Sequence, residues 1–128
     1  MRKVSKALGK FAEHDIQADC VKLLDGYGVI HIHTDVMCAL AYLGSNQGRR
    51  MGFIANQKKM GYTVGQSDLI LLLRNGKFVC VEMKTPVGSL RPEQKLFKEA
   101  VEKKDGEYVV WRSVADCEQW LSENRYRL

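Results

Sequence analysis

Residues 68–112 constrain the fold more than any other part of the 128-residue chain. Two apolar runs, 68–73 (DLILLL) and 77–84 (KFVCVEMK), predict neighbouring strands, because the Arg-Asn-Gly between them is typical of a hairpin turn. A helix is predicted at about 92–104 and a further strand at 107–112 (EYVVWR). A strand, a helix and a second strand in this order indicate a parallel crossover. The hairpin and the crossover together predict an α/β fold with a mixed β-sheet flanked by helices.

The remaining elements are predicted from periodicity and turn residues on either side of this segment. The alternating residues 27–34 predict a strand, whereas the apolar stretch 35–43 fits no one period, so its structure is left open. Further helices are predicted at 10–25, 49–60 and 114–122. In the helix at 92–104, Pro92 suits the first helical position. The residues of that helix expected to face the sheet are Leu96, Phe97, Ala100 and Val101.

Length and composition indicate one compact domain over residues 1–128, with 45% hydrophobic residues to form its core. No apolar run is long enough for a membrane span, and the first residues lack the apolar core of a signal peptide, so a cytoplasmic protein is expected. Four widely spaced cysteines are then interpreted as reduced thiols that pack in the core. They are Cys20, Cys38, Cys80 and Cys117. The net charge of +5 favours an anionic partner only weakly.

The turn sequence leaves two registers open for the hairpin. A two-residue type I′ turn would pair Arg74 with Lys77 and would place Asp68 opposite Met83. A three-residue loop, formed by a type I turn and a left-handed glycine, would shift the pairing by one residue and place Asp68 directly opposite Glu82. We predict the three-residue loop.

Charged residues are costly in a covered sheet unless they are paired or bind a metal ion. Glu82 and Lys84 are two residues apart in their strand and share a face, and in the predicted register the Cβ atoms of Asp68 and Glu82 are about 5 Å apart. Two carboxylates so close repel each other unless a cation lies between them, and their hard oxygen atoms suit Mg²⁺ or Mn²⁺. The alternative is that all three charges are simply solvated at the strand ends.

Five motifs occur in order along the chain. They are Glu13 with Gln17, Met60-Gly61, Gly65-Gln66-Ser67-Asp68-Leu69, Glu82-Met83-Lys84, and Gly88-Ser89-Leu90-Arg91-Pro92-Glu93-Gln94. In this combination the chain resembles the PD-(D/E)xK nuclease superfamily and, within it, the virus-type replication-repair nuclease (VRR-NUC) domain. The similarity covers nearly the whole chain, except for residues 35–48. Ser67 departs from the usual proline, and Arg91 stands where a serine or threonine usually caps the helix.

The resemblance implies a restriction-endonuclease-like fold with an αβββαβ core and a metal site. Asp68, Glu82 and the backbone carbonyl of Met83 would hold Mg²⁺ or Mn²⁺, and Glu13 would reach the metal directly or through water. Gln17, one helical turn from Glu13, would either orient Glu13 or act directly.

Two further residues would complete the chemistry that the resemblance implies. Lys84 would orient or deprotonate the attacking water and stabilise the charge of the transition state. Gln94, at the start of the helix after the hairpin, would hydrogen-bond water or phosphate.

DNA is the implied substrate, and small members of the family look like homodimers that cut branched DNA such as four-way (Holliday) junctions. The apolar stretch Val36–Leu43 is the candidate dimer surface. The alternatives are a flap or repair nuclease with the same site and a DNA-binding module that does not cleave. A binding module would not need the Asp68, Glu82 and Lys84 set. The family's distribution favours a phage origin, with the protein acting in a bacterial or phage-infected cell.

Phosphate contacts are expected from the basic residues that flank the site. Those on the predicted helix at 49–60 are expected first, because this helix directly precedes the hairpin. They are Arg49, Arg50, Lys58 and Lys59, followed by Arg91 and Lys95 at the start of the next helix. No element resembles a base-reading motif, so we expect recognition of the DNA backbone.

Two histidines, His31 and His33, share a face of the strand predicted at 27–34. Such a pair can bind Zn²⁺, but neither a cysteine nor a third histidine is recognised at a matching spacing. We therefore expect both histidines to make ordinary hydrogen bonds.

Overall fold

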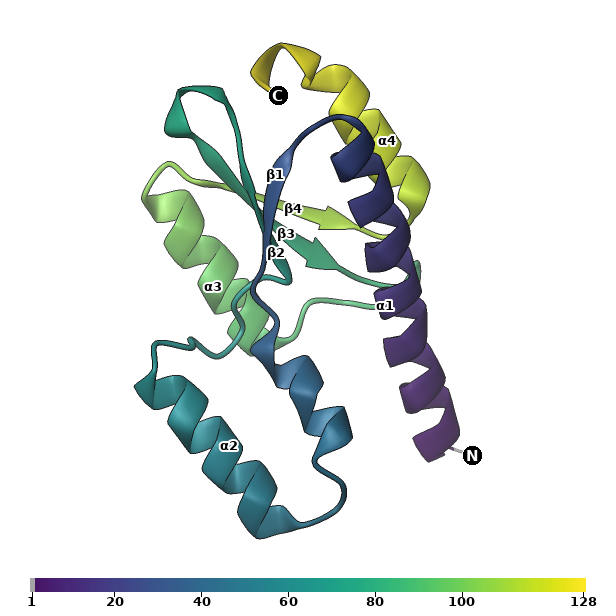
Figure 1. The fold of residues 1–128 in the computed structure, drawn as a ribbon, viewed down its shortest axis with the longest axis vertical. Coiled ribbons are helices and arrows are strands. Elements are labelled where there is room, and N and C mark those ends of the chain that lie inside the picture. Colours follow the sequence, from purple (N-terminus) through teal and green to yellow (C-terminus); the bar gives the residue numbers. More distant parts are fainter. Residues whose placement is uncertain (1) are drawn as a thin grey trace.

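The computed structural model describes the backbone of residues 2–128 and the side chains from residue 12 onward. In chain order the elements are α1 (Arg2–Gly26), β1 (Ile30–His33), the 3₁₀ helix η1 (Val36–Tyr42), α2 (Gln47–Lys59), β2 (Leu69–Leu72), the 3₁₀ turn η2 (Arg74–Gly76), β3 (Phe78–Met83), α3 (Pro92–Lys103), β4 (Glu107–Trp111), α4 (Val114–Glu123) and the 3₁₀ turn η3 (Arg125–Arg127). The strands form one sheet in the order β1-β2-β3-β4 (Figure 1). The predicted order of elements is confirmed, and η1 fills the segment whose structure the sequence left open.

The sheet is mixed, as predicted. β1 pairs antiparallel with β2, and β2 pairs antiparallel with β3. β3 pairs parallel with β4, and α3 connects these two strands along the chain. Two predicted boundaries are wrong. α1 begins at Arg2, earlier than residue 10, and β1 is shorter than the predicted strand at 27–34.

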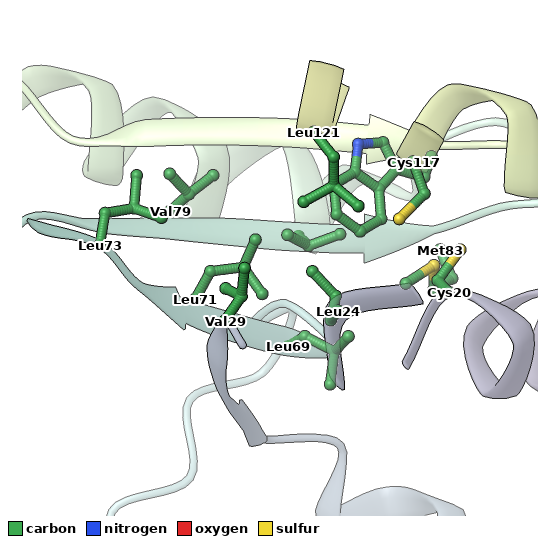
Figure 2. Close-up of a cluster of buried hydrophobic side chains, with 12 residues drawn as sticks. Cys20, Leu24, Val29, Leu69, Leu71, Leu73, Val79, Met83, Cys117 and Leu121 are labelled. Atoms are coloured by element: carbon green, nitrogen blue, oxygen red, sulfur yellow. The ribbon is translucent and has the colours of Figure 1, made fainter. Parts of the chain in front are cut away.

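One face of the sheet packs against α1 and α4 (Figures 1 and 2). The apolar stripes of both helices meet the inward side chains of the central strands, where alternate residues point to the same face. The core comprises Cys20 and Leu24 of α1, Cys117 and Leu121 of α4, and the strand residues Leu69, Leu71, Val79, Val81, Met83 and Trp111, together with Val29 and Leu73. This core fixes β2 and β3, the strands that carry the predicted site.

The opposite face is covered by α3, and the stripe predicted from its sequence is only partly correct, because Phe97 and Val101 are half-buried whereas the other two residues are not. Leu96 is 66% exposed and Ala100 is also exposed. The residues that turn toward the sheet are Gln94, which is 4% exposed, and Phe97, whose ring contacts Tyr108 edge-on at 6.3 Å. The stripe that faces the sheet therefore begins with a polar side chain, and this placement brings Gln94 to the site.

The β2–β3 hairpin has the predicted three-residue register. Leu69 pairs with Val81, Leu72 pairs with Phe78, and the N–H of Leu73 donates to the carbonyl of Lys77 (2.6 Å). The predicted turn type is wrong in one detail. Asn75 (φ 63°) and Gly76 (φ 70°) are both left-handed, as in a type I′ turn, although the register is that of the longer loop.

η1 and α2 form an arm beside the sheet (residues 36–59, hereafter the η1–α2 arm; Figure 1). α2 is capped by Asn46, whose Oδ1 accepts from the N–H of Arg49 (3.0 Å), and it contains no buried residue. Within the described part of the chain, no helix is long and apolar enough to cross a membrane.

The prediction that all four cysteines pack in the core is only partly correct. Cys20, Cys80 and Cys117 are buried, as expected. Cys38 is half-buried and lies on η1, outside the core cluster.

Candidate active site

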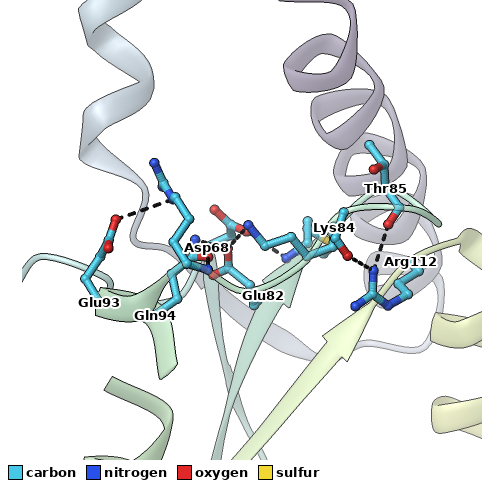
Figure 3. A network of polar contacts seen from close by, with 10 residues as sticks. Asp68, Glu82, Lys84, Thr85, Glu93, Gln94 and Arg112 are labelled. Atoms are coloured by element: carbon cyan, nitrogen blue, oxygen red, sulfur yellow. Dashed lines mark hydrogen bonds and ion pairs between the residues drawn. The ribbon is translucent and has the colours of Figure 1, made fainter. Parts of the chain in front are cut away.

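The backbone at the start of β2 positions Asp68 at the predicted site. Its carbonyl accepts from the N–H of Thr34 (2.9 Å), and its N–H donates to the carbonyl of Val81 (3.0 Å). The Asp68 side chain then bonds to the backbone of β3, since its Oδ2 accepts from the N–H of Met83 (2.7 Å). This carboxylate stands where a backbone carbonyl would otherwise accept. Asp68 is thereby held beside the end of β3, where Glu82 lies (Figure 3).

Glu82 is the most deeply buried acid of this cluster, with 3% of its surface exposed. Its Oε1 accepts from Gln94 Nε2 (2.8 Å) and lies 3.8 Å from Lys84 Nζ, and Lys84 is itself only 6% exposed (Figure 3). Its Oε2 is buried and has no hydrogen-bond partner among the residues that the structure describes. An unpartnered carboxylate oxygen is costly in a protein interior, so this atom points to a ligand.

The electrostatics of the acidic pair also favour a bound cation. Burial, more than any other cause, raises the pKa of Glu82 to about 9, and the nearby carboxylate of Asp68 adds to this increase. Burial raises the pKa of Asp68 to about 6, against the hydrogen bond from Met83. Both shifts show that, without a cation, this pocket disfavours two negative charges.

Two more carboxylates act on this pair. Glu13 of α1, predicted as a site residue, raises the pKa of both Asp68 and Glu82. Asp35, between β1 and η1, has the same effect. The sequence analysis missed Asp35, because the position of β1 beside β2 could not be inferred from the sequence. A carboxylate just after the strand predicted at 27–34 was the signal that could have identified it.

Gly65 brings the start of α3 against the loop before β2. Its φ is +87°, and a Cβ atom there would lie 2.2 Å from the backbone oxygen of Glu93. Only glycine fits such a contact. Arg91 is the N-cap of α3, as predicted, and its N–H donates to Gln94 Oε1 (2.9 Å). Because Gln94 Nε2 donates to Glu82, both ends of the Gln94 amide have partners within the protein.

The loop after β3 is held by Arg112, which the sequence analysis also missed. Arg112 Nη1 donates to the carbonyls of Thr85 (2.9 Å) and Gly88 (Figure 3). The N–H of Lys84 donates to the carbonyl of Trp111 (3.0 Å). Parallel neighbouring strands end at the same edge of a sheet. Arg112, a charged residue directly after β4, could therefore have been expected near the end of β3.

Comparison with known proteins identifies the family. The sequence model of the VRR-NUC domain matches residues 39–115, more than half of the chain. The chain belongs to the VRR-NUC domain family. A solved structure described as a VRR_NUC domain is similar in fold, with a TM-score of 0.59 and 19% identity over 90% of this chain and 98% of that chain. No curated protein matches the chain. Membership in the VRR-NUC family makes it a nuclease of the PD-(D/E)xK type, which implies DNA as the substrate.

The residues around the acidic pair of this VRR-NUC domain fit a divalent metal ion. Asp68 and Glu82 supply hard oxygen atoms, and the unpartnered Oε2 of Glu82 is an available ligand. Divalent metals are typical of this nuclease family. A cation at this position would offset the burial, and the repulsion from neighbouring carboxylates, that raise both pKa values.

The basic residues predicted to contact DNA divide into two groups in this VRR-NUC domain. Arg91 and Lys95 are exposed at the start of α3, the helix that donates Gln94 to the site. Arg49, Lys58 and Lys59 are exposed on α2. Arg50 differs from these, because its guanidinium donates to the carbonyls of Leu40 (2.8 Å) and Gly44 (3.2 Å) and so holds η1 against α2.

The two strand histidines have different surroundings. His31 Nε2 lies 2.7 Å from Asp25 Oδ1, the ordinary contact that was expected. His33 lies instead close to Asp35 and Cys38. Sequence spacing did not identify Cys38 as a neighbour of His33, because η1 is what folds Cys38 back toward β1. The expected ordinary hydrogen bond is therefore found for His31 only, within the described contacts.

Proposed function

We propose that this VRR-NUC domain is a metal-dependent, structure-selective DNA endonuclease that acts as a homodimer on branched DNA such as four-way junctions. One observation supports the metal-dependent reaction above all. A buried glutamate, Glu82, keeps an oxygen atom without a partner in the described structure, and it does so beside Asp68 and Lys84.

Asp68, Glu82 and the Met83 carbonyl would hold Mg²⁺ or Mn²⁺, with Glu13 close by. The bound ion supplies Lewis-acid stabilisation of the charge on the scissile phosphate and promotes ionisation of water. The protein's contribution is to hold these ligands in place before DNA arrives. The N–H of Met83 orients Asp68, and the amide of Gln94 orients Glu82.

Lys84 would orient the attacking water and stabilise the charge that develops on phosphate. Its ammonium group is nearly excluded from solvent, and electrostatic interactions are stronger in such surroundings than in water. Gln94 was expected to contact water or phosphate. Because both ends of its amide are occupied within the protein, we assign Gln94 to positioning Glu82.

The reaction is tested with labelled linear, flap and four-way-junction DNA in Mg²⁺, Mn²⁺ or EDTA. We expect symmetric cuts in the junction with either metal and no cleavage in EDTA. Lys84→Met should abolish cleavage, whereas Lys103→Met, a change at an exposed lysine of α3, should not. Cleavage that survives EDTA, or that is unchanged in Lys84→Met, would refute the mechanism.

The same assay separates the alternatives. Preferred cleavage of the flap would favour a flap or repair nuclease with this site. DNA that is retarded in a gel but remains intact with every metal would favour a binding module.

Two surfaces are candidates for the homodimer contact. The first is the predicted stretch Val36–Leu43, in which Tyr42 is 90% exposed. The second is an apolar row across three strands, in which Ile30 pairs with Leu72 and Leu72 pairs with Phe78; these side chains are 59%, 41% and 52% exposed, respectively. We favour the row, since contiguous exposed apolar residues are typical of protein contacts.

Sedimentation of Phe78→Lys and Tyr42→Lys distinguishes the two surfaces. We expect a dimer for the wild type and for Tyr42→Lys, and a monomer for Phe78→Lys. A monomeric wild type would refute the homodimer, and a monomeric Tyr42→Lys would move the contact to η1.

A further inference from the structure

A second group of potential metal ligands lies where β1 meets η1. His33, Asp35 and Cys38 each offer one ligand atom, and these three atoms lie within 4.8 Å of one another. His33 is exposed, and the other two residues are half-buried. None of the three was predicted as a ligand of the nuclease site.

Backbone hydrogen bonds hold this junction in place. Thr34, between His33 and Asp35, donates its N–H to the carbonyl of Asp68 (2.9 Å) and accepts at its own carbonyl from Gln66 Nε2 (2.6 Å). The Thr34 hydroxyl donates to the carbonyl of Ser67. The chain on both sides of Thr34 is therefore fixed to the loop before β2, and η1 starts directly afterwards and returns Cys38 toward His33.

The three ligand types differ from those of the acidic pair. An imidazole nitrogen, a thiolate sulfur and a carboxylate oxygen form a set that Zn²⁺ binds well and that Mg²⁺ does not favour. Tetrahedral zinc with ligand distances of about 2.0–2.3 Å places its ligands roughly 3.3–3.8 Å apart. Side-chain rotations that bring the ligand atoms about 1 Å closer together would close the group around an ion. The exposure of His33 leaves room for water as a fourth ligand.

We propose that His33, Asp35 and Cys38 bind one Zn²⁺ ion, at a second site that shares no ligand with Asp68 and Glu82. The two sites adjoin each other, because Asp35 acts electrostatically on that pair. The ion would connect β1 to η1 and so fix the η1–α2 arm, which carries Arg49, Lys58 and Lys59, relative to the sheet. This proposal does not depend on the DNA structure that the nuclease cuts.

Titration of the full chain with Co²⁺ tests the site, because cobalt substitutes for zinc and reports a thiolate ligand by a charge-transfer band. We expect this band to saturate at one equivalent, to disappear on addition of Zn²⁺ and to persist in excess Mg²⁺. Zn²⁺ should also raise the Tm of the wild type, since an ion that binds only the folded state stabilises it. A wild type that gives no thiolate band at one equivalent of Co²⁺ would overturn the proposal.

Matched variants identify the ligands. Cys38→Ser and His33→Ala should each weaken cobalt binding by more than the roughly 10–100-fold that the loss of an outer-shell partner costs, and Zn²⁺ should no longer raise the Tm of Cys38→Ser. His31→Ala, a change of the neighbouring histidine on the same strand, should keep the band. Asp68→Asn should also keep it while losing cleavage, which separates this site from the nuclease site. A band that survives in Cys38→Ser, or that is lost in Asp68→Asn, would refute a separate site.

Discussion

The acidic site on β2 and β3 and the η1–α2 arm differ in how their charged residues are held. In the site, Glu82, Lys84 and Gln94 are almost completely buried, and each of them contacts another member of the cluster. In the arm, α2 has no buried residue, and Arg49, Lys58 and Lys59 extend into solvent. Both regions are rich in charge, but only the first pays a desolvation cost.

This difference separates two tasks. Buried and oriented charges are suited to chemistry, because a low dielectric strengthens each interaction and fixes its geometry. Exposed cations are suited to capturing DNA through its phosphates, since they can adapt to a backbone of varying shape. A change in the site should therefore alter the rate of cleavage, whereas a change in the arm should alter affinity.

The largest expected effect is the loss of cleavage when an acid of the site is neutralised. Glu82→Gln and Asp68→Asn should each lower the rate at saturating DNA by at least about 10²–10³-fold, because each removes a proposed metal ligand. Single-turnover cleavage measures this effect. Glu99→Gln, at an exposed acid of α3, should retain the wild-type rate. A Glu82→Gln rate within tenfold of wild type would contradict the assignment.

Alanine substitutions at two glycines, one beside the site and one in the arm, test how tightly each region is packed. Gly65→Ala would drive a methyl group into the backbone of Glu93 at a positive φ, so we expect a loss of about 2–3 kcal/mol in the free energy of unfolding and a large fall in cleavage. Gly52→Ala, in α2, meets no atom within 4 Å and should stabilise the helix by about 0.5–1 kcal/mol. Urea unfolding measures both changes. A neutral Gly65→Ala would show that α3 is not held closely against the loop before β2.

The pH dependence of stability should originate in the acidic site. In the absence of metal, the folded state holds protons on Asp68 up to about pH 6 and on Glu82 up to about pH 9, whereas the unfolded chain releases them near pH 4. The folded state therefore binds more protons between these values, and the free energy of unfolding should fall as the pH rises.

Urea unfolding in EDTA at pH 5, 7 and 9 tests this trend. Glu82→Gln should flatten it and should be more stable than wild type at high pH. Stability that rises over this range in the wild type would show that the two acids are not coupled to folding as their burial implies.

The smallest expected effect concerns the arm. Changing Arg49, Lys58 and Lys59 together to alanine should weaken DNA binding and lower the slope of log K against log salt by about 2.7, if each residue contacts one phosphate. The rate at saturating DNA should remain unchanged. Arg50→Ala should instead loosen the arm, because its guanidinium holds the carbonyls of Leu40 and Gly44. An unchanged salt slope in the triple variant would leave Arg91 and Lys95 as the main phosphate contacts.

Local sequence signals were sufficient for the part of the site that lies on one hairpin. The Arg-Asn-Gly turn limited β2 and β3 to two possible registers, and the one that was predicted brings Asp68 near Glu82. The left-handed conformation of Asn75 was not predicted, because more than one combination of dihedral angles closes a loop of this length.

Contacts between distant segments were not predictable in the same way. Asp35 acts on the acidic pair only because β1 lies beside β2, and Arg112 holds the loop after β3 only because β4 runs parallel to that strand. Periodicity also misplaced the inner face of α3. It favoured apolar Leu96 over Gln94, whose burial depends on its hydrogen bonds to the Arg91 N–H and Glu82.

The sequence alone predicted the order of strands and helices along the chain, from periodicity and turn chemistry. It allowed two hairpin registers, of which the predicted one is present, and its motifs proposed Asp68, Glu82 and Lys84 as the central group. The tertiary structure decided which residues surround that group. It buried Glu82 with one oxygen atom unpartnered in the described structure, turned Gln94 inward, and folded Cys38 back toward His33. The physical reason is that burial and electrostatic coupling depend on which surfaces meet in space, and a linear pattern specifies only how each segment presents its own faces.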